Sequence, residues 1–179
     1  LKLMNQDKSQ CKVYLARPCQ YTNSIMCDKK YWTSHRFSKE VINSYNESLD
    51  FIKKEYKNSS FTLVGYSGGG AIVTLLSATR SDIDSFVTIA GNLDIEKWTT
   101  MYNLSKLDGS LNPADYSKKL ENIKQFHMIG SDDRIIPKDI FLSYLSNFEK
   151  KDKISFELFK SDHNCCWEEY YKKVLNSGK

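Results

Sequence analysis

The chain has 179 residues, of which 40% are hydrophobic and 13% aromatic, so it can bury one domain-sized core. Its 26 lysines and arginines exceed its 22 acidic residues, but they are scattered along the chain instead of forming a block, which argues against nucleic acid binding. No apolar run approaches the ~20 residues that a membrane-spanning helix needs. We therefore expect a single domain over residues 1–179, with neither a nucleic acid partner nor a transmembrane segment.

The first predicted element is a strand at residues 12–16, which ends before a proline. Residues 1–10 have neither an initiator methionine nor the charged and then apolar pattern of a signal peptide, so we expect that Leu1 is not the native N-terminus. After a loop, a helix is predicted to follow Ser38, a suitable N-cap, because apolar residues then recur with helical spacing. These residues are Val41, Tyr45, Leu49, Ile52 and Tyr56.

The next apolar run, residues 61–64, has the length of a buried parallel strand, and residues 71–79 have the apolar density of a buried helix. Between them lies a Gly-x-Ser-x-Gly motif centred on Ser67. In a strand, turn and helix context, the serine of this motif occupies a sharp turn with strained dihedral angles that exposes its Oγ. Ser67 is therefore the candidate nucleophile. The alternative is a glycine-rich turn that binds a phosphate or binds nothing.

The glycines of the motif have separate roles in this interpretation. Gly65 and Gly69 are expected to leave room for the turn, because a side chain at either position would collide with the neighbouring strand or helix. The backbone N–H of Gly68 lies at the positive end of the following helix. It is the candidate donor to the oxyanion that forms when a carbonyl is attacked.

The remaining elements predict an α/β fold. Near-continuous apolar strands are expected at residues 85–90, 125–129 and 154–159, and a helix at residues 137–148. Residues 92–123 have a weaker pattern and form a modest insertion with one short helix. Five strands thus alternate with helices, without an internal repeat or linker. This pattern predicts a parallel sheet flanked by helices.

A carboxylate for a catalytic triad should follow the end of a strand, because ligands bind at the carboxyl edge of a parallel sheet. Asp132 and Asp133 follow the strand that ends near Gly130. Asp133 is the better candidate for the acid. The alternative interpretation is that both aspartates only cap the helix that opens at Pro137.

Of the three histidines, His163 is the candidate base, because it alone follows the end of a predicted strand. His127 lies in the middle of a strand and is best explained as a core residue, and His35 lies in the loop before the first helix. The resulting order Ser67, Asp133, His163 is the chain order of α/β-hydrolase triads.

The spacing of Cys19 and Cys27, eight positions apart in a loop, suits a local disulfide and so favours an oxidising compartment. Cys11 is then left over. Cys165 and Cys166 could form a vicinal disulfide, pair elsewhere or stay reduced beside the site. The absence of a Cys-x-x-Cys pair argues against zinc, and no metal or cofactor is predicted.

Several segments together resemble a group of bacterial α/β-hydrolases that are often exported or described as lipoproteins. The segments are residues 14–21, Cys27, Trp32, Arg36-Phe37, the elbow 65–69, residues 90–94, residues 109–115, the acid turn 130–137 and residues 163–167. The resemblance spans nearly the whole chain. It implies an eight-stranded hydrolase fold, a serine mechanism and a periplasmic, secreted or lipid-anchored location, and it implies no particular substrate.

The resemblance also implies that the N-terminal strands of the fold are missing from this chain. Hydrolases of this kind begin with three more strands, and the loop after the third supplies the second oxyanion N–H. If residues 12–16 are the fourth strand, the chain is the C-terminal part of a longer protein. The missing N-terminal segment of the same protein is then an expected partner of this chain.

A carboxylic ester is the expected substrate of such a triad, with an amide or peptide as the alternative. A small-molecule acyl group would bind near the insertion, where Trp98 and Met101, together with Tyr66 of the elbow, are candidates to line a pocket. Core packing explains aromatic residues of the insertion equally well. A third interpretation is a binding module with a hydrolase-derived fold and no turnover, since one oxyanion donor is absent.

Overall fold

The computed structural model describes residues 2–22, 24–25, 27–58 and 60–176. In this part of the chain, four parallel strands form one sheet in the order β1, β2, β3, β4. The strands are β1 (Phe61–Tyr66), β2 (Ile83–Ile89), β3 (Lys124–Gly130) and β4 (Ile154–Phe159). The α-helices are α1 (Lys39–Tyr56), α2 (Gly68–Thr79), α3 (Ile95–Met101), α4 (Ser117–Leu120), α5 (Lys138–Ser146) and α6 (Trp167–Asn176). Short 3-10 helices lie at Met4–Gln6, Lys29–Trp32 and Pro113–Tyr116.

Four of the five predicted strands are confirmed, but the strand predicted at residues 12–16 is wrong. This segment forms no strand, and none of the described strands pairs with it. β-favouring residues form a strand only where a neighbouring strand accepts their backbone hydrogen bonds. Here Val13 and Tyr14 are half-exposed, while Leu15 packs against the core between α1 and α2.

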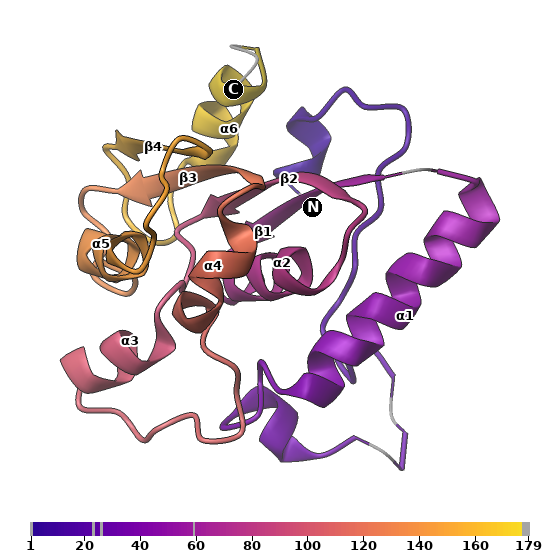
Figure 1. The fold of residues 1–179 in the computed structure, drawn as a ribbon, viewed down its shortest axis with the longest axis horizontal. Helices are drawn as coiled ribbons and strands as arrows, with labels where there is room; N and C mark the ends of the chain where they lie inside the picture. Colours follow the sequence, from indigo (N-terminus) through magenta and orange to yellow (C-terminus); the bar gives the residue numbers. More distant parts are fainter. Residues whose placement is uncertain (1, 23, 26, 59, 177–179) are drawn as a thin grey trace.

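Helix α6, which the sequence pattern did not predict, covers one face of the sheet. Met128 of β3 shares a buried cluster with Trp167 of α6. Its neighbour in sequence, Ile129, points to the opposite face, because side chains alternate along a strand. There it shares a second cluster with Val73 of α2 and Phe141 of α5. Figure 1 shows α6 and α2 on opposite sides of the sheet, so the fold has three layers.

Helix α1 begins where the sequence predicts, since the Oγ of Ser38 accepts a hydrogen bond from the N–H of Val41 at 3.4 Å. The predicted apolar face is buried over its first half and exposed at Tyr56, where α1 extends away from the body of the fold (Figure 1). Neither α1 nor any other described helix has the length and apolar character that crossing a bilayer requires.

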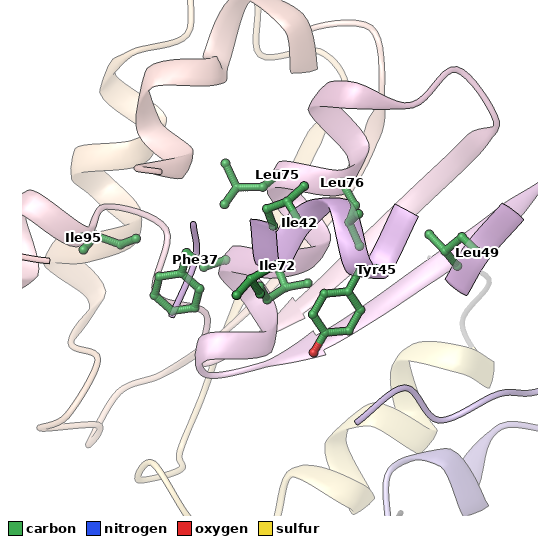
Figure 2. Close-up of a cluster of buried hydrophobic side chains, with 10 residues drawn as sticks. Phe37, Ile42, Tyr45, Leu49, Ile72, Leu75, Leu76 and Ile95 are labelled. Carbon is green, nitrogen blue, oxygen red and sulfur yellow. The ribbon is translucent and has the colours of Figure 1, made fainter. Parts of the chain in front are cut away.

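The buried face of α1 packs against α2. Figure 2 shows this cluster, in which side chains of the two helices pack together. Phe37, from the loop before α1, and Ile95, from α3, complete it. The labelled members are Phe37, Ile42, Tyr45, Leu49, Ile72, Leu75, Leu76 and Ile95. This contact holds α2, and with it the turn that contains Ser67, against the rest of the fold.

The carboxyl ends of all four strands lie at one edge of the sheet, because the strands are parallel and in register. The segment after β2 reaches across this edge to the end of β1. A Cβ on Gly70 of α2 would lie 2.7 Å from the Cα of Gly91, so the start of α2 and this segment are in close contact. The loops after β1, β3 and β4 therefore open onto a shared region, where each carries one of the predicted site residues.

Cys19 and Cys27 form a disulfide, as the sequence predicts. A closed loop of this size stabilises the fold by about 2–3 kcal/mol in the chain-entropy model. Cys165 and Cys166 are bonded to each other, which selects one of the three alternatives considered for them. Among the described residues, Cys11 is an exposed free cysteine.

Candidate active site

Ser67 lies in the turn between β1 and α2 with φ 54° and ψ −119°, a strained conformation for a residue with a side chain. The expectation of a strained turn is confirmed. Backbone hydrogen bonds hold it in place, because the N–H of Ser67 donates to the carbonyl of Ile89 at 2.9 Å. The carbonyl of Ser67 accepts from the N–H groups of Gly70, at 2.9 Å, and Asn92, at 3.1 Å. The end of β2 and the segment after it therefore fix the serine.

The two outer glycines of the motif differ in their surroundings. A Cβ on Gly65 would lie 2.2 Å from the carbonyl oxygen of Gly69, so this glycine is required for the close approach of β1 and α2. A Cβ on Gly69 would meet nothing within 4 Å. The expectation that a side chain at Gly69 would collide is therefore wrong, because this position of α2 points into open space. Gly68, the candidate oxyanion donor, opens α2 beside the ring of Phe37.

Asp133 is buried, with 4% of its surface exposed, in the loop after β3. Its Oδ1 accepts hydrogen bonds from the backbone N–H groups of Ile135 and Ile136, both at 2.8 Å. These bonds orient the carboxylate and leave Oδ2 free to accept from another group. The neighbouring Asp132 is exposed, and α5 begins after Pro137 without a side-chain cap, so neither aspartate caps this helix.

His163, which is 8% exposed, lies in the loop after β4 between the other two side chains. Its Nδ1 is 2.8 Å from Oδ2 of Asp133, and its Nε2 is 2.9 Å from Oγ of Ser67. The structure thus brings together the three predicted triad residues from three different loops. The carboxylate fixes the tautomer in which Nδ1 carries the proton, which leaves the Nε2 lone pair directed at the serine hydroxyl.

The other two histidines lie outside this arrangement. His127 is 1% exposed in the centre of β3, and burial lowers its pKa to about 3. Its ring nitrogens are hydrogen-bonded to Thr88 and Gln125, at 2.7 and 3.2 Å, so it is a core histidine as predicted. The Nδ1 of His35 is bonded to the hydroxyl of Ser34 at 2.8 Å.

Asp162, the residue before the base, points elsewhere. Its Oδ1 accepts from the N–H groups of Asn164 and Cys165, at 2.8 and 2.7 Å, and its side chain is exposed. This turn shapes the loop that carries His163. Asp133, and not Asp162, is therefore the carboxylate that contacts the imidazole.

Two of the three candidate pocket residues, Trp98 and Tyr66, make hydrogen bonds that the sequence does not reveal. The indole N–H of Trp98 donates to the carbonyl of Ile135 at 2.9 Å, so α3 is tied to the loop of the acid. Met101 is 38% exposed at the end of α3. The hydroxyl of Tyr66 donates to the carbonyl of His163 at 2.5 Å. That these residues line an acyl pocket stays a prediction.

Hydrogen bonds join the three side chains directly to one another. Within the described residues, no three His, Cys, Asp or Glu side chains gather in a way that could hold a metal ion. A serine with a histidine at its hydroxyl and a buried carboxylate behind the histidine is the constellation of nucleophilic acyl transfer.

The parallel sheet, the strained turn and the Ser, Asp, His order define an α/β-hydrolase fold with the side chains of a serine hydrolase. The chain belongs to the serine hydrolase (FSH1) family, whose model matches residues 4–165. No curated protein sequence matches the chain significantly.

Solved structures agree with this fold. The esterase PF2001 of Pyrococcus furiosus has a TM-score of 0.62 and 14% identity over 78% of this chain and 60% of its own length. The esterase domain of a Rhodothermus marinus protein has a TM-score of 0.61 and 14% identity over 76% of this chain and 67% of its own. The α/β-hydrolase MGS-MChE2, from a sediment metagenome of the Mar Chica lagoon in Morocco, has a TM-score of 0.58 and 14% identity, with coverage of 76% and 68%. The chain thus spans about 60% of the first of these esterases.

Proposed function

We propose that this protein hydrolyses carboxylic esters through an acyl-enzyme intermediate. The observation that supports the proposal most directly is the pair of hydrogen bonds that joins Asp133 to His163 and His163 to Ser67, at 2.8 and 2.9 Å. A serine hydroxyl is a weak nucleophile by itself and needs a base within hydrogen-bonding distance. Two of the structural neighbours described above are named as esterases, which is consistent with an ester substrate.

In the proposed reaction, Oγ of Ser67 attacks the acyl carbonyl while its proton passes to Nε2 of His163. The backbone N–H of Gly68 donates to the oxyanion of the tetrahedral intermediate. When the intermediate collapses, the bond to the leaving alkoxide breaks and His163 returns the proton to that oxygen. Water then attacks the acyl-enzyme by the same steps, with His163 taking its proton and returning it to Oγ of Ser67. Asp133 stabilises the imidazolium during both acylation and deacylation.

A fluorophosphonate probe tests this assignment in the full-length protein. We expect covalent labelling of Ser67, found by peptide mapping, and no labelling in Ser67→Ala. Ser161, in the loop after β4 that carries His163, is an internal control. It is buried, and its hydroxyl is hydrogen-bonded to the backbone carbonyls of Asp162 and Cys165. Labelling at Ser161, or at any position other than Ser67, would contradict the proposal.

The kind of acyl substrate is tested separately. We expect p-nitrophenyl esters to be hydrolysed faster than amino-acyl arylamides, because the alkoxide or phenoxide of an ester leaves more easily than an amine. Turnover should be measured for esters of increasing acyl length and for a matched series of arylamides. Faster turnover of the arylamides would make the protein an amidase with the same side chains.

We also propose that a further segment of the same protein pairs with β1. Among the described residues, β1 pairs with β2 alone, so its outer edge is open. A strand there would cover this edge, and its loop would supply a second oxyanion donor. Loss of one such donor costs about 10²–10³ in turnover in other serine enzymes. If the full protein has no such segment, the interpretation as a binding module gains support.

We infer from the disulfide between Cys19 and Cys27 that the protein works in an oxidising compartment, such as the periplasm or the exterior of the cell. Structural disulfides form and persist there and are rare in the cytosol. The resemblance to exported hydrolases supports the same location.

A further inference from the structure

The backbone carbonyl of His163 accepts hydrogen bonds from two aromatic side chains. The hydroxyl of Tyr66 donates to it at 2.5 Å, and the indole N–H of Trp167 donates to it at 3.0 Å. Tyr66 is the last residue of β1, and Trp167 is the first residue of α6. The base residue is therefore held through its main chain, independently of the bonds that its imidazole makes.

The bond from Tyr66 joins the residue that precedes the nucleophile to the main chain of the base. Tyr66 is the covalent neighbour of Ser67, whose own backbone is fixed by bonds to β2 and α2. The loop that carries His163 has no helix or strand of its own. One hydroxyl thus ties this loop directly to the residue that precedes the nucleophile.

The tyrosine ring adds to this contact. Its centroid lies 5.3 Å from that of the His163 imidazole, with an angle of 36° between the planes. Burial, and then the negative charges of Asp133 and Asp162, raise the pKa of Tyr66. The hydroxyl therefore keeps its proton at neutral pH and acts as a donor.

We propose that Tyr66 is a positioning residue, whose hydroxyl holds the main chain of His163 so that Nε2 stays within reach of Ser67. This role rests on the proposed function. It differs from the role that the sequence suggests for Tyr66, which is to line a substrate pocket. A positioning residue affects the chemical step, whereas a pocket residue affects substrate binding.

The substitution Tyr66→Phe tests the role, with Tyr170→Phe as a matched control. The hydroxyl of Tyr170 also donates to a carbonyl of the base loop, that of Lys160 at 3.1 Å, but three residues away from the base. We expect Tyr66→Phe to lower kcat about 10- to 100-fold, because small displacements of a reacting group have effects of this size. KM and the melting temperature should match those of the control.

The rate of fluorophosphonate labelling should fall in parallel with kcat, since it needs the same geometry but no pocket for an acyl chain. A raised KM with unchanged kcat would overturn the proposal and make Tyr66 a pocket residue. Equal kcat in Tyr66→Phe and Tyr170→Phe would also overturn it. If Tyr66→Phe lowers the melting temperature, kcat measured well below that temperature should still be reduced with KM unchanged, and a normal kcat under those conditions would overturn the proposal.

If the proposed function itself is wrong, the experiments should give a different result. In that case Ser67→Ala would be labelled and would turn over esters as well as the parent protein does. Loss of activity in Ser67→Ala together with normal kcat in Tyr66→Phe would refute the positioning role alone.

Discussion

Replacing Asp133 by asparagine should lower turnover about 10⁴-fold, because an amide in place of the orienting carboxylate holds the histidine in the wrong tautomer. The structure shows why the amide would be turned this way. Two backbone N–H groups, from Ile135 and Ile136, bind the Oδ1 position, so the asparagine oxygen would stay there. Its NH₂ would then face Nδ1 of His163, which would have to accept instead of donate. The proton would move to Nε2, and His163 could no longer take the proton of Ser67.

Asp162→Asn is the control for this prediction. Asparagine keeps the oxygen that accepts from Asn164 and Cys165, so the turn should persist and most of the activity should remain. Turnover of a p-nitrophenyl ester by the two variants in the full-length protein is the measurement. A larger loss in Asp162→Asn than in Asp133→Asn would overturn the assignment of the acid, while leaving Ser67 and His163 in place.

Gly65→Ala should destabilise the protein by about 3 kcal/mol, at the upper end of the cost of overpacking, and reduce activity by at least about 10²-fold. The added methyl group would lie 2.2 Å from the carbonyl oxygen of Gly69 and 2.7 Å from the backbone nitrogen of Gly70. These are backbone atoms of the first turn of α2, which cannot yield as the end of a flexible side chain can. The start of α2 would have to move away from β1, and Ser67 would move with it.

Gly69→Ala controls for the added methyl group, since nothing lies within 4 Å of the new atom. Alanine is favoured over glycine in a helix by up to about 1 kcal/mol, so this variant should be at least as stable as the parent protein. Urea denaturation compares the stabilities, and ester turnover reports the position of Ser67. A Gly65→Ala variant that matches its parent in both measurements would show that β1 and α2 do not need to approach so closely.

The parts of the fold that local patterns determine were predictable from the sequence. Buried parallel strands are nearly continuous apolar runs, and β1 to β4 were found in this way. The site residues were predictable because each follows the end of such a strand, where a parallel sheet collects its loops. The alternation of strands and helices then predicts that Ser67, Asp133 and His163 lie together at the carboxyl ends of the strands.

Features that depend on distant partners were not predictable. Residues 12–16 have the composition of a strand but no described neighbour to pair with, and composition cannot reveal a missing partner. Helix α6 presents a short apolar face, with Trp167, Tyr171 and Val174 buried, which is easily mistaken for a loop after the last strand. The bond from Tyr66 to the carbonyl of His163 joins residues 97 positions apart, and no local pattern signals it.

The long separation between nucleophile and base has a consequence for biosynthesis. The elbow of β1 and α2 is complete early in the chain, but the bond from His163 to Ser67 spans 96 positions and needs β4 in place. Chains are made from the N-terminus, and contacts of long separation form only after loop closure has been achieved. A ribosome-bound chain that ends before β4 would carry an exposed serine without its base. Such a nascent chain would lack the base that we propose for Ser67, so this pair of residues could act together only after the loop that follows β4 has been made.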